Sequence, residues 1–292
     1  TVAPPTTGGT WSTAPSNMAT PRQALAGAGT QAAALAFGGL APGTTGATEQ
    51  YSSEVWSPAS SMITPRSDVA GVGTQAAALA FGGSAPGLSA TEEYSGGTWT
   101  SPGGSNMINP RQALAGAGTQ AAALAFGGTS NPTLQNATEE YSGGTWSPAP
   151  SNITPARRAL AGAGTQQAAL AFGGFDGSNT AATEEYNSGT WSSGGNMAIA
   201  RRALAASGTQ TSALAFGGFS TTNTGATEEY NSGTWSNAPA NMTITRNDLA
   251  GAGTQTAALA FGGSTPGVTG ATQEWVANPG ELIANGFNFD SV

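Results

Sequence analysis

The chain lacks several residue types that common forms of catalysis and metal binding require. It has no cysteine, which rules out disulfide bonds, thiolate metal sites and cysteine nucleophiles. It has no histidine, so a Ser-His-Asp triad is also excluded. Lysine is absent as well, and all eight basic residues are arginines. These absences remove several classes of active site, and we expect no cofactor and no bound metal.

Charge is scarce and its balance is negative. Only 8% of the residues are charged, and the formal net charge is −8. A negative balance argues against nucleic acid and anionic membrane surfaces as partners. No apolar run approaches the roughly 20 residues that a membrane-spanning helix needs, so we expect no membrane insertion.

A Phe-Gly-Gly triplet occurs six times at nearly constant intervals. Successive triplets are separated by 44, 45, 46, 44 and 45 residues. A period of this length, with four short β-like segments per unit, is typical of a β-propeller with one blade per repeat. We therefore predict an all-β, six-bladed propeller with four antiparallel strands per blade, in one domain over residues 1–276. The triplets begin at Phe37, Phe81, Phe126, Phe172, Phe216 and Phe261.

The fourth repeat shows the four predicted strands, named a to d in chain order. It runs from Arg157 through two runs of small residues and a polar loop to Tyr186 and Trp191. Alanine favours helix, but a helix here would contain Gly162 and Gly164, at a cost of about 1 kcal/mol each. We therefore favour an a–b hairpin with a Gly-Thr-Gln turn. Its small residues would let the inner strands approach one another near the axis.

Strands c and d each contribute one large aromatic residue per repeat. We expect these rings to fill the wedge between neighbouring blades, where each ring would bury about 150–250 Å². Stacking against sugars is the alternative role. The strand c residues are Tyr51, Tyr94, Tyr141, Tyr186, Tyr230 and Trp275, and the strand d residues are Trp11, Trp56, Trp99, Trp146, Trp191 and Trp235.

The N-terminal segment predicts how the ring closes. Trp275 has no tryptophan five residues after it, whereas Gly8-Gly9-Thr10-Trp11 precedes the first full repeat on its own. We infer that residues 8–13 supply strand d of blade six, whose other strands lie near residues 247–276. Such closure removes exposed sheet edges. Residues 277–292 fall outside the repeat, and we expect them to form a C-terminal tail that docks or serves as a linker.

Taken together, these shared positions resemble kelch repeats. The resemblance rests on the Gly-Gly pair after strand b, the tyrosine of strand c, the tryptophan of strand d and an arginine before strand a. It covers all six units and implies a propeller without implying an activity. The phrases Ala-Leu-Ala-Phe-Gly-Gly and Ala-Thr-Glu-Glu-Tyr are also similar to kelch-like proteins of marine bacteriophages, notably cyanophages. That second resemblance implies a virion or surface role.

Arginine and glutamate recur once or more in each repeat. We expect a structural ion pair or network, worth only about 0–1 kcal/mol per pair if it is exposed. A ring of anion-binding arginines at one channel mouth is the alternative. The repeat arginines are Arg22, Arg66, Arg111, Arg157, Arg201 and Arg246, with Arg158 and Arg202 as additional residues. The acidic pairs are Glu92-Glu93, Glu139-Glu140, Glu184-Glu185 and Glu228-Glu229, with Glu49 and Glu274 as single members.

Variation among the repeats is confined to two kinds of connection. The a–b turn is Gly-Thr-Gln in all six units, and the c–d turn varies little, whereas the b–c loops and the d–a connections differ. Because strand direction alternates, both variable kinds should emerge on one face, where loops on a rigid scaffold often carry function. Unselected drift is the alternative explanation. The candidate recognition residues are Leu40, Leu88, Leu134, Phe175, Asp176 and Phe219.

These patterns favour a non-enzymatic protein on a virion or another extracellular surface. It would be a structural or adhesion module, with other virion or surface proteins, or cell-surface glycans, as partners. A glycosidase needs two carboxylates in a single cleft, and the repeated carboxylates single out no such pair. Asp176 begins Asp-Gly-Ser-Asn, which has one carboxylate and suits an ordinary turn better than a calcium loop. The alternative is a secreted bacterial carbohydrate-binding or carbohydrate-active propeller.

Overall fold

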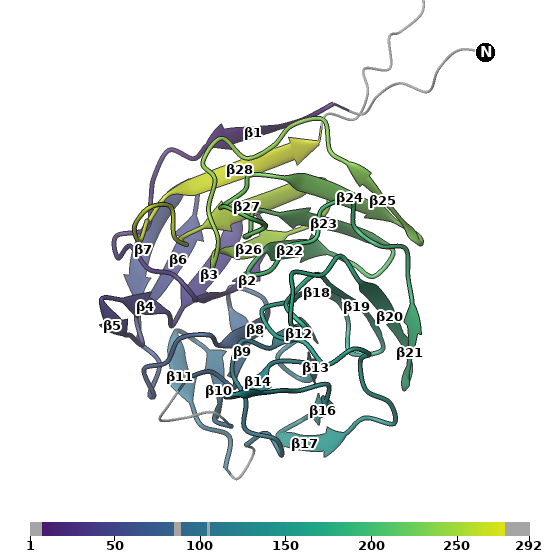
Figure 1. Ribbon diagram of the computed structural model, residues 1–292. Helices are drawn as coiled ribbons and strands as arrows, with labels where there is room; N and C mark the ends of the chain where they lie inside the picture. The colour runs from purple at the N-terminus through teal and green to yellow at the C-terminus, as the bar shows by residue number, and fades with distance from the viewer. Residues whose placement is uncertain (1–7, 85–88, 104–105, 278–292) are drawn as a thin grey trace, which may run out of the picture.

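The protein is a six-bladed β-propeller (Figure 1). The computed structural model describes residues 8–84, 89–103 and 106–277. Within these ranges, six four-stranded antiparallel sheets surround a central axis, and the innermost strands of neighbouring sheets contact one another. The fold predicted from the repeat is confirmed. The described residues include no helix that is long and apolar enough to cross a bilayer.

Each blade contains strands a to d from the axis outward. Blade 1 comprises β2 (Ala26–Gly29), β3 (Ala33–Phe37), β6 (Thr48–Ser52) and β7 (Val55–Ala59). Blade 2 comprises β8 (Ala70–Gly73), β9 (Ala77–Phe81), β10 (Thr91–Ser95) and β11 (Thr98–Thr100). Blade 3 comprises β12 (Ala115–Gly118), β13 (Ala122–Phe126), β16 (Thr138–Ser142) and β17 (Thr145–Pro148).

The second half of the ring repeats this arrangement. Blade 4 comprises β18 (Ala161–Gly164), β19 (Ala168–Phe172), β20 (Thr183–Asn187) and β21 (Thr190–Ser193). Blade 5 comprises β22 (Ala205–Gly208), β23 (Ser212–Phe216), β24 (Thr227–Asn231) and β25 (Thr234–Asn237). Blade 6 comprises β26 (Ala250–Gly253), β27 (Ala257–Phe261), β28 (Thr272–Ala277) and β1 (Gly9–Thr13). Two short ribbons lie in b–c loops: β4 (Leu40–Ala41) with β5 (Gly43–Thr44), and β14 (Thr129–Ser130) with β15 (Thr133–Leu134).

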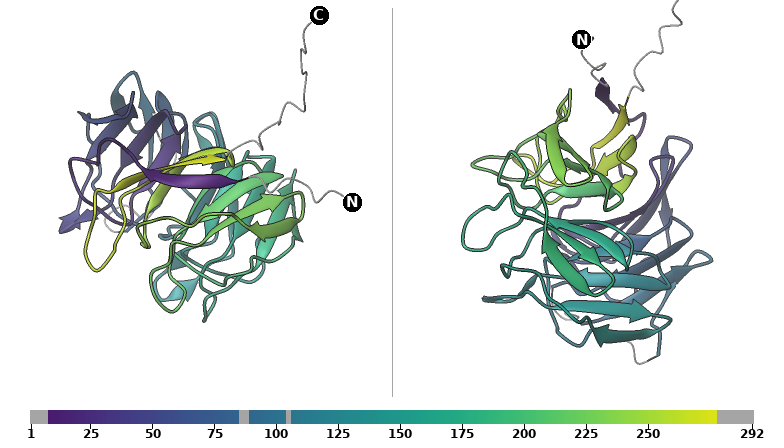
Figure 2. Two further views of the ribbon diagram at one scale, coloured as in Figure 1. Left: turned by 90° about the horizontal axis from the view of Figure 1, so that it is seen from above. Right: turned by 90° about the vertical axis from the view of Figure 1, so that its right-hand side faces the viewer.

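The ring closes through the N-terminal strand, as predicted. β1, the purple strand in Figure 2, lies beside the yellow β28 and pairs with it antiparallel. In this pairing Trp11 lies opposite Trp275. The inner strands β2 and β26 also contact each other, so the first and last repeats meet at the axis. Because β28 extends to Ala277, the predicted tail can begin no earlier than residue 278. The remainder of that tail lies outside the described residues.

Small residues are required where the inner strands approach one another. A Cβ atom built on Gly27 would lie 2.6 Å from Cζ of Phe261 and 2.7 Å from the carbonyl oxygen of Gly251, both in the neighbouring blade. Real side chains do not tolerate such distances. The second glycine of the Phe-Gly-Gly triplet has a different reason: Gly39 has a φ of 110°, a conformation that disfavours other residues. These two requirements explain why glycine recurs at fixed positions in the repeat.

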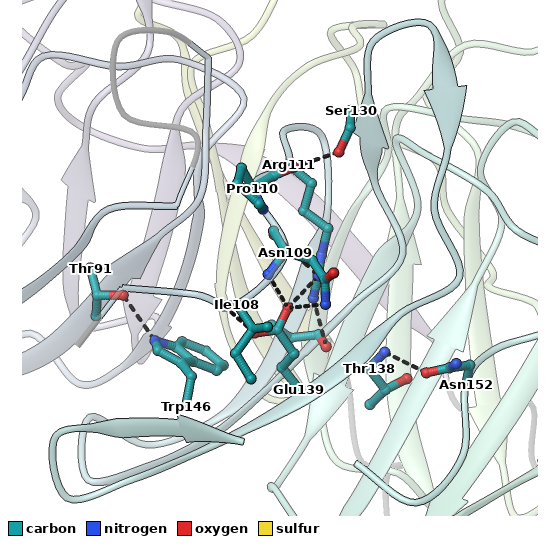
Figure 3. A network of polar contacts seen from close by, with 11 residues as sticks. Thr91, Ile108, Asn109, Pro110, Arg111, Ser130, Thr138, Glu139, Trp146 and Asn152 are labelled. Atoms are coloured by element: carbon teal, nitrogen blue, oxygen red, sulfur yellow. Dashed lines mark hydrogen bonds and ion pairs between the residues drawn. The ribbon is translucent and has the colours of Figure 1, made fainter. Parts of the chain in front are cut away.

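The strand d tryptophans join neighbouring blades. In every blade the indole ring lies 4.8–5.1 Å, between ring centroids, from the Phe-Gly-Gly phenylalanine of the preceding blade. Each Nε1–H also donates a hydrogen bond to a threonine Oγ1 of that preceding blade; Trp146 donates to Thr91 in this way (Figure 3). The expected aromatic wedge is therefore present and carries a hydrogen bond that the sequence did not indicate.

Five of the six repeat arginines form buried ion pairs. The pairs have N–O distances between 2.5 and 3.1 Å, and every guanidinium is fully buried. In blade 3, Glu139 accepts hydrogen bonds from Arg111 and from the backbone N–H groups of Ile108 and Asn109 (Figure 3). The predicted structural ion pairs are therefore present in five blades, and the small contribution expected of exposed pairs does not apply because these charges lie in the core. Burial makes breaking a pair costly.

In four blades, the glutamate that follows the arginine-pairing position has a separate role. Tyr51, Tyr141, Tyr186 and Tyr230 donate their phenol O–H groups to a carboxylate of the preceding blade, and Tyr94 accepts a hydrogen bond from Gln50. Burial and the nearby carboxylates raise the pKa of the four donating tyrosines. The repeated carboxylates are thus used within and between blades.

Candidate functional site

The two faces of the propeller are built differently. On one face, the glutamine of each Gly-Thr-Gln turn donates through Nε2 to two backbone carbonyls of the preceding blade, at 2.6–3.2 Å. This contact requires the same residue in every repeat. The uniformity of that face therefore has a structural cause.

The opposite face carries both kinds of variable connection, and we call it the variable face. In every blade a backbone N–H in the d–a connection donates to a carbonyl in a b–c loop; Met18 donates to Gly270, and Met242 donates to Gly225. These bonds place the b–c loops and the d–a connections side by side. The sequence-based prediction of a shared face is confirmed.

The channel mouth on the variable face is formed by a closed ring of backbone hydrogen bonds. One residue from each blade adopts a left-handed conformation, with φ between 51° and 53°. Each donates its N–H to the carbonyl of its counterpart in the preceding blade, at 2.7–3.0 Å, and the sixth bond completes the circle. The residues are Ala24, Asp68, Ala113, Ala159, Ala203 and Asp248. Such a conformation costs of order 1 kcal/mol or more per non-glycine residue, and the ring of bonds holds it.

A cavity of about 100 Å³ lies inside this ring. Its lining includes Asp68 and Asp248, together with the leucine or valine that directly precedes each strand a. Burial raises the pKa of Asp68 above its ordinary value. Burial and the charge of Asp68 raise the pKa of Asp248 to about 6, against an opposing effect of Arg202. The mouth therefore combines two carboxylates with an apolar floor.

The two additional arginines lie next to this mouth. All six repeat arginines are fully buried, whereas Arg158 is exposed and Arg202 is half-buried. The chain has eight basic residues in all, and all eight lie within the described ranges. Arg158 and Arg202 are thus the only side-chain cations that solvent reaches. They directly precede Ala159 and Ala203 of the backbone ring.

Both arginines stack on phenylalanines of the b–c loops. Arg158 and Phe175 exchange two backbone hydrogen bonds, and Arg202 and Phe219 do the same in the next blade. The Cζ atom of Arg202 lies 4.6 Å from the ring centroid of Phe219 and 5.3 Å from that of Phe175. Arg158 lies 5.4 Å from the ring centroid of Phe175. We call these four residues the Arg–Phe ladder.

Two asparagines connect adjacent b–c loops around the ladder. Asn179 donates to the carbonyls of Phe219 and Ser220 in the next blade, and its Oδ1 accepts from Arg202 at 2.8 Å. Asn223 donates in the same way to Ser264 and Thr265 of blade 6. These bonds order the loops of blades 4, 5 and 6 relative to one another.

The candidate recognition residues predicted from sequence lie in different settings. Leu40 in β4 and Leu134 in β15 are half-buried, and Leu88 lies outside the described residues. Phe175 and Phe219 are half-buried beneath arginines. Asp176 accepts a hydrogen bond from the N–H of Ser178 in a local turn. In the described part of the chain, no group of three or more acidic residues could hold a metal ion.

Sequence reasoning missed the residues that make the mouth distinctive. Arg158 and Arg202 were noted only as additions to the repeat, and Asp68 and Asp248 received no role. The available signal was position: all four replace uncharged residues at the two positions that follow the repeat arginine. Their approach to one another becomes visible only when the ring closes.

The comparisons with known proteins establish the fold and no family. No family model matches the chain, and no curated protein matches its sequence. The fold is similar to the solved structure of YjhT, a kelch-repeat protein, with a TM-score of 0.70 and 13% sequence identity. The match covers 88% of this chain and 95% of that chain. The protein is therefore a six-bladed propeller that is structurally similar to a kelch-repeat protein.

Proposed function

We propose that this protein is a non-catalytic recognition module on a virion or another extracellular surface. Its variable face would hold the partner, either another virion or surface protein or a cell-surface glycan. The opposite, uniform face and the closed ring would serve as a rigid support. The observation that carries this proposal is the segregation of all loop variation, together with both accessible arginines, to one face.

The use of the repeated glutamates supports a non-catalytic role. In five blades the first glutamate of the repeat pairs with a buried arginine, and in four blades the glutamate at the next position accepts from a tyrosine. A carboxylate held in this way is not available for acid–base chemistry on a bound substrate. Two features of the sequence support the surface location. One is the composition, with 8% charged residues and no lysine, and the other is the similarity of short sequence segments to kelch-like phage proteins.

Loop exchange tests this proposal. The b–c loops of blades 4 and 5, residues 175–181 and 219–225, would be replaced by the loop of blade 1, residues 40–46. We expect the exchanged protein to fold and to lose binding to the particle or cells that retain the unaltered chain. As a control, exchange of c–d turns among blades should leave binding intact. If the loop-exchanged protein binds as well as the unaltered one, the recognition face is refuted.

The secreted carbohydrate-binding propeller differs from this proposal in cellular context. Co-purification distinguishes them, because a virion component sediments with particles whereas a secreted protein remains in the culture supernatant.

A further inference from the structure

We infer that the Arg–Phe ladder is a binding site for a carboxylate group, and that the ligand is an acidic saccharide of the hexuronic acid type. This inference rests on the proposed function, since it names the ligand class of the variable face. It starts from a difference among blades. At the position of Arg158 and Arg202, the other four repeats carry Gln23, Ser67, Gln112 and Asn247.

The ladder holds its guanidinium groups in a fixed orientation. Backbone hydrogen bonds to Phe175 and Phe219 fix the backbone positions of Arg158 and Arg202, respectively. The two phenyl rings then support the planar guanidinium groups. A guanidinium that stacks on an aromatic ring keeps its N–H donors in its own plane, where they match the two oxygens of a carboxylate. Arg202 uses Nη1 for Asn179. The guanidinium of Arg158 donates no hydrogen bond to any other residue in the described ranges.

The charge of the rest of the molecule limits what the site can bind. The net charge is −8, and only these two side-chain cations reach solvent. A polyanion such as nucleic acid would gain two contacts and would be repelled by the remaining surface. A ligand with one or two carboxylates satisfies both arginines and meets less of this repulsion than a polyanion does. The site therefore suits an isolated carboxylate group.

The surroundings of the ladder favour a ligand rich in hydroxyl groups. Asp68 lies within electrostatic range of Arg158, and Asp248 lies within range of Arg202. These two carboxylates disfavour further anionic groups beside the arginines but accept hydrogen bonds from hydroxyls. The loops next to the arginines carry further polar groups, including Ser178 and Thr221. Arginine clusters also bind acidic peptides, but here both phenylalanines are covered by arginines, so the ladder offers no apolar pocket for the other side chains of a peptide. A sugar acid, with one carboxylate and several hydroxyls, uses the arginines and the aspartates together.

Paired ligands and paired variants test this inference. Binding of a digalacturonate and of its fully methyl-esterified form would be measured by calorimetry with the full chain. We expect the acid to bind and the ester, which keeps the hydroxyls but lacks the charges, to bind at least about tenfold more weakly. The double variant Arg158→Gln/Arg202→Gln places in blades 4 and 5 the residue that blades 1 and 3 carry naturally, so it should fold and melt normally. It should lose affinity for the acid by about tenfold to a hundredfold.

The control variant is Gln23→Ala/Gln112→Ala, which alters the same position in blades 1 and 3 and should leave affinity for the acid unchanged. Equal binding of acid and ester, or an unchanged affinity in the double arginine variant, would overturn the carboxylate site. Binding of a diglutamate peptide in preference to the digalacturonate would overturn the saccharide. If loop exchange abolishes partner binding while the arginine variant retains it, the recognition face stands and this site falls. If loop exchange has no effect, the proposed function fails first.

Discussion

At the residue scale, blade 6 departs from the other five in the core. Gln273 occupies the position at which the other repeats have the ion-pairing glutamate. Arg246 is nevertheless fully buried, and it donates to the carbonyl oxygens of Ala260, Gly262 and Ala271. Burial without a carboxylate lowers the pKa of Arg246 to about 9. The positive charge of Arg246 therefore has no carboxylate partner, unlike the charges of the other five repeat arginines.

Supplying the missing carboxylate should stabilise the protein. We expect Gln273→Glu to raise the free energy of unfolding by about 1–2 kcal/mol, because Arg246 gains a charged hydrogen-bond partner. Glu139→Gln makes the reverse change in blade 3 and should lower it by roughly 3 kcal/mol, since Arg111 is left buried without its partner. Urea unfolding at pH 7 measures both. A destabilising Gln273→Glu would contradict this account of blade 6.

A second prediction concerns the pH dependence of stability. The folded-state pKa of Asp248 is about 6, above its ordinary value of 3.8. Between these values the folded state binds the proton more tightly than the unfolded state, so stability falls as pH rises through this window. Asp248→Asn should raise the melting temperature at pH 7 and flatten the slope between pH 4 and 6. Asparagine tolerates the left-handed conformation of this position, so the backbone ring should persist.

The control for this prediction is Asp176→Asn, which removes a carboxylate from a turn outside the cavity. It should leave the slope between pH 4 and 6 as it is in the unaltered protein. If Asp248→Asn has the same slope as the unaltered protein, burial of that carboxylate does not control stability in this range.

At the element scale, the a–b turn acts as a connection between blades. Gln120 illustrates it: its amide donates to the carbonyls of Ala78 and Tyr94 in the preceding blade, at 3.2 and 2.7 Å. The pattern Gly-Thr-Gln was enough to predict a tight turn, because glycine and threonine have local preferences. The contacts of the glutamine could not be predicted, since they depend on the placement of the neighbouring sheet.

Changing this glutamine tests the role of the turn. Gln120→Glu keeps the shape of the side chain but replaces the donor by a carboxylate that faces two carbonyl oxygens. We expect it to lower the free energy of unfolding by about 1–3 kcal/mol, because both acceptors lose their partner. Thermal and urea unfolding would measure this loss.

Thr119→Ser, in the same turn, serves as the matched control and should have little effect, because serine keeps the hydroxyl that accepts from the N–H of Ala122. Equal stability of Gln120→Glu and the unaltered chain would show that the turn contributes little between blades.

The loops show the limit of what the sequence predicts at this scale. Their location on one face follows from alternating strand direction and was predicted correctly. Phe175 and Phe219 are predicted as recognition residues because they lie in the variable b–c loops. In the structure their rings support Arg158 and Arg202, so the groups offered to a partner are cationic. This stacking depends on the backbone pairing of each arginine with its phenylalanine. That pairing forms only when the d–a connection packs on the b–c loop.

At the scale of the whole molecule, the interfaces around the ring are unequal. The repeat period and the isolated N-terminal Trp11 were sufficient to predict six blades and their closure, because a closed ring needs each strand type once per blade. The interface that lacks one of the repeated contacts could not be predicted from the repeat alone. Trp275 replaces the tyrosine of blade 6, so Glu229 receives no phenol hydrogen bond of the kind that joins other blades. Burial raises the pKa of Glu229.

Closure by β1 should therefore control the stability of the entire ring. Deleting residues 1–13 removes Trp11, its contacts with Phe216 and Thr227, and the pairing with β28. We expect the truncated chain to melt at a lower temperature and to aggregate, because β28 becomes an exposed sheet edge.

Deleting only residues 1–7 keeps β1 and should leave the melting temperature unchanged. A synthetic peptide of residues 8–14, added in excess, should restore part of the loss by binding β28, whereas the same peptide with Trp11→Ala should not. An unchanged melting temperature after removal of residues 1–13 would show that the five complete blades and the remaining strands of blade 6 hold the ring without its last strand.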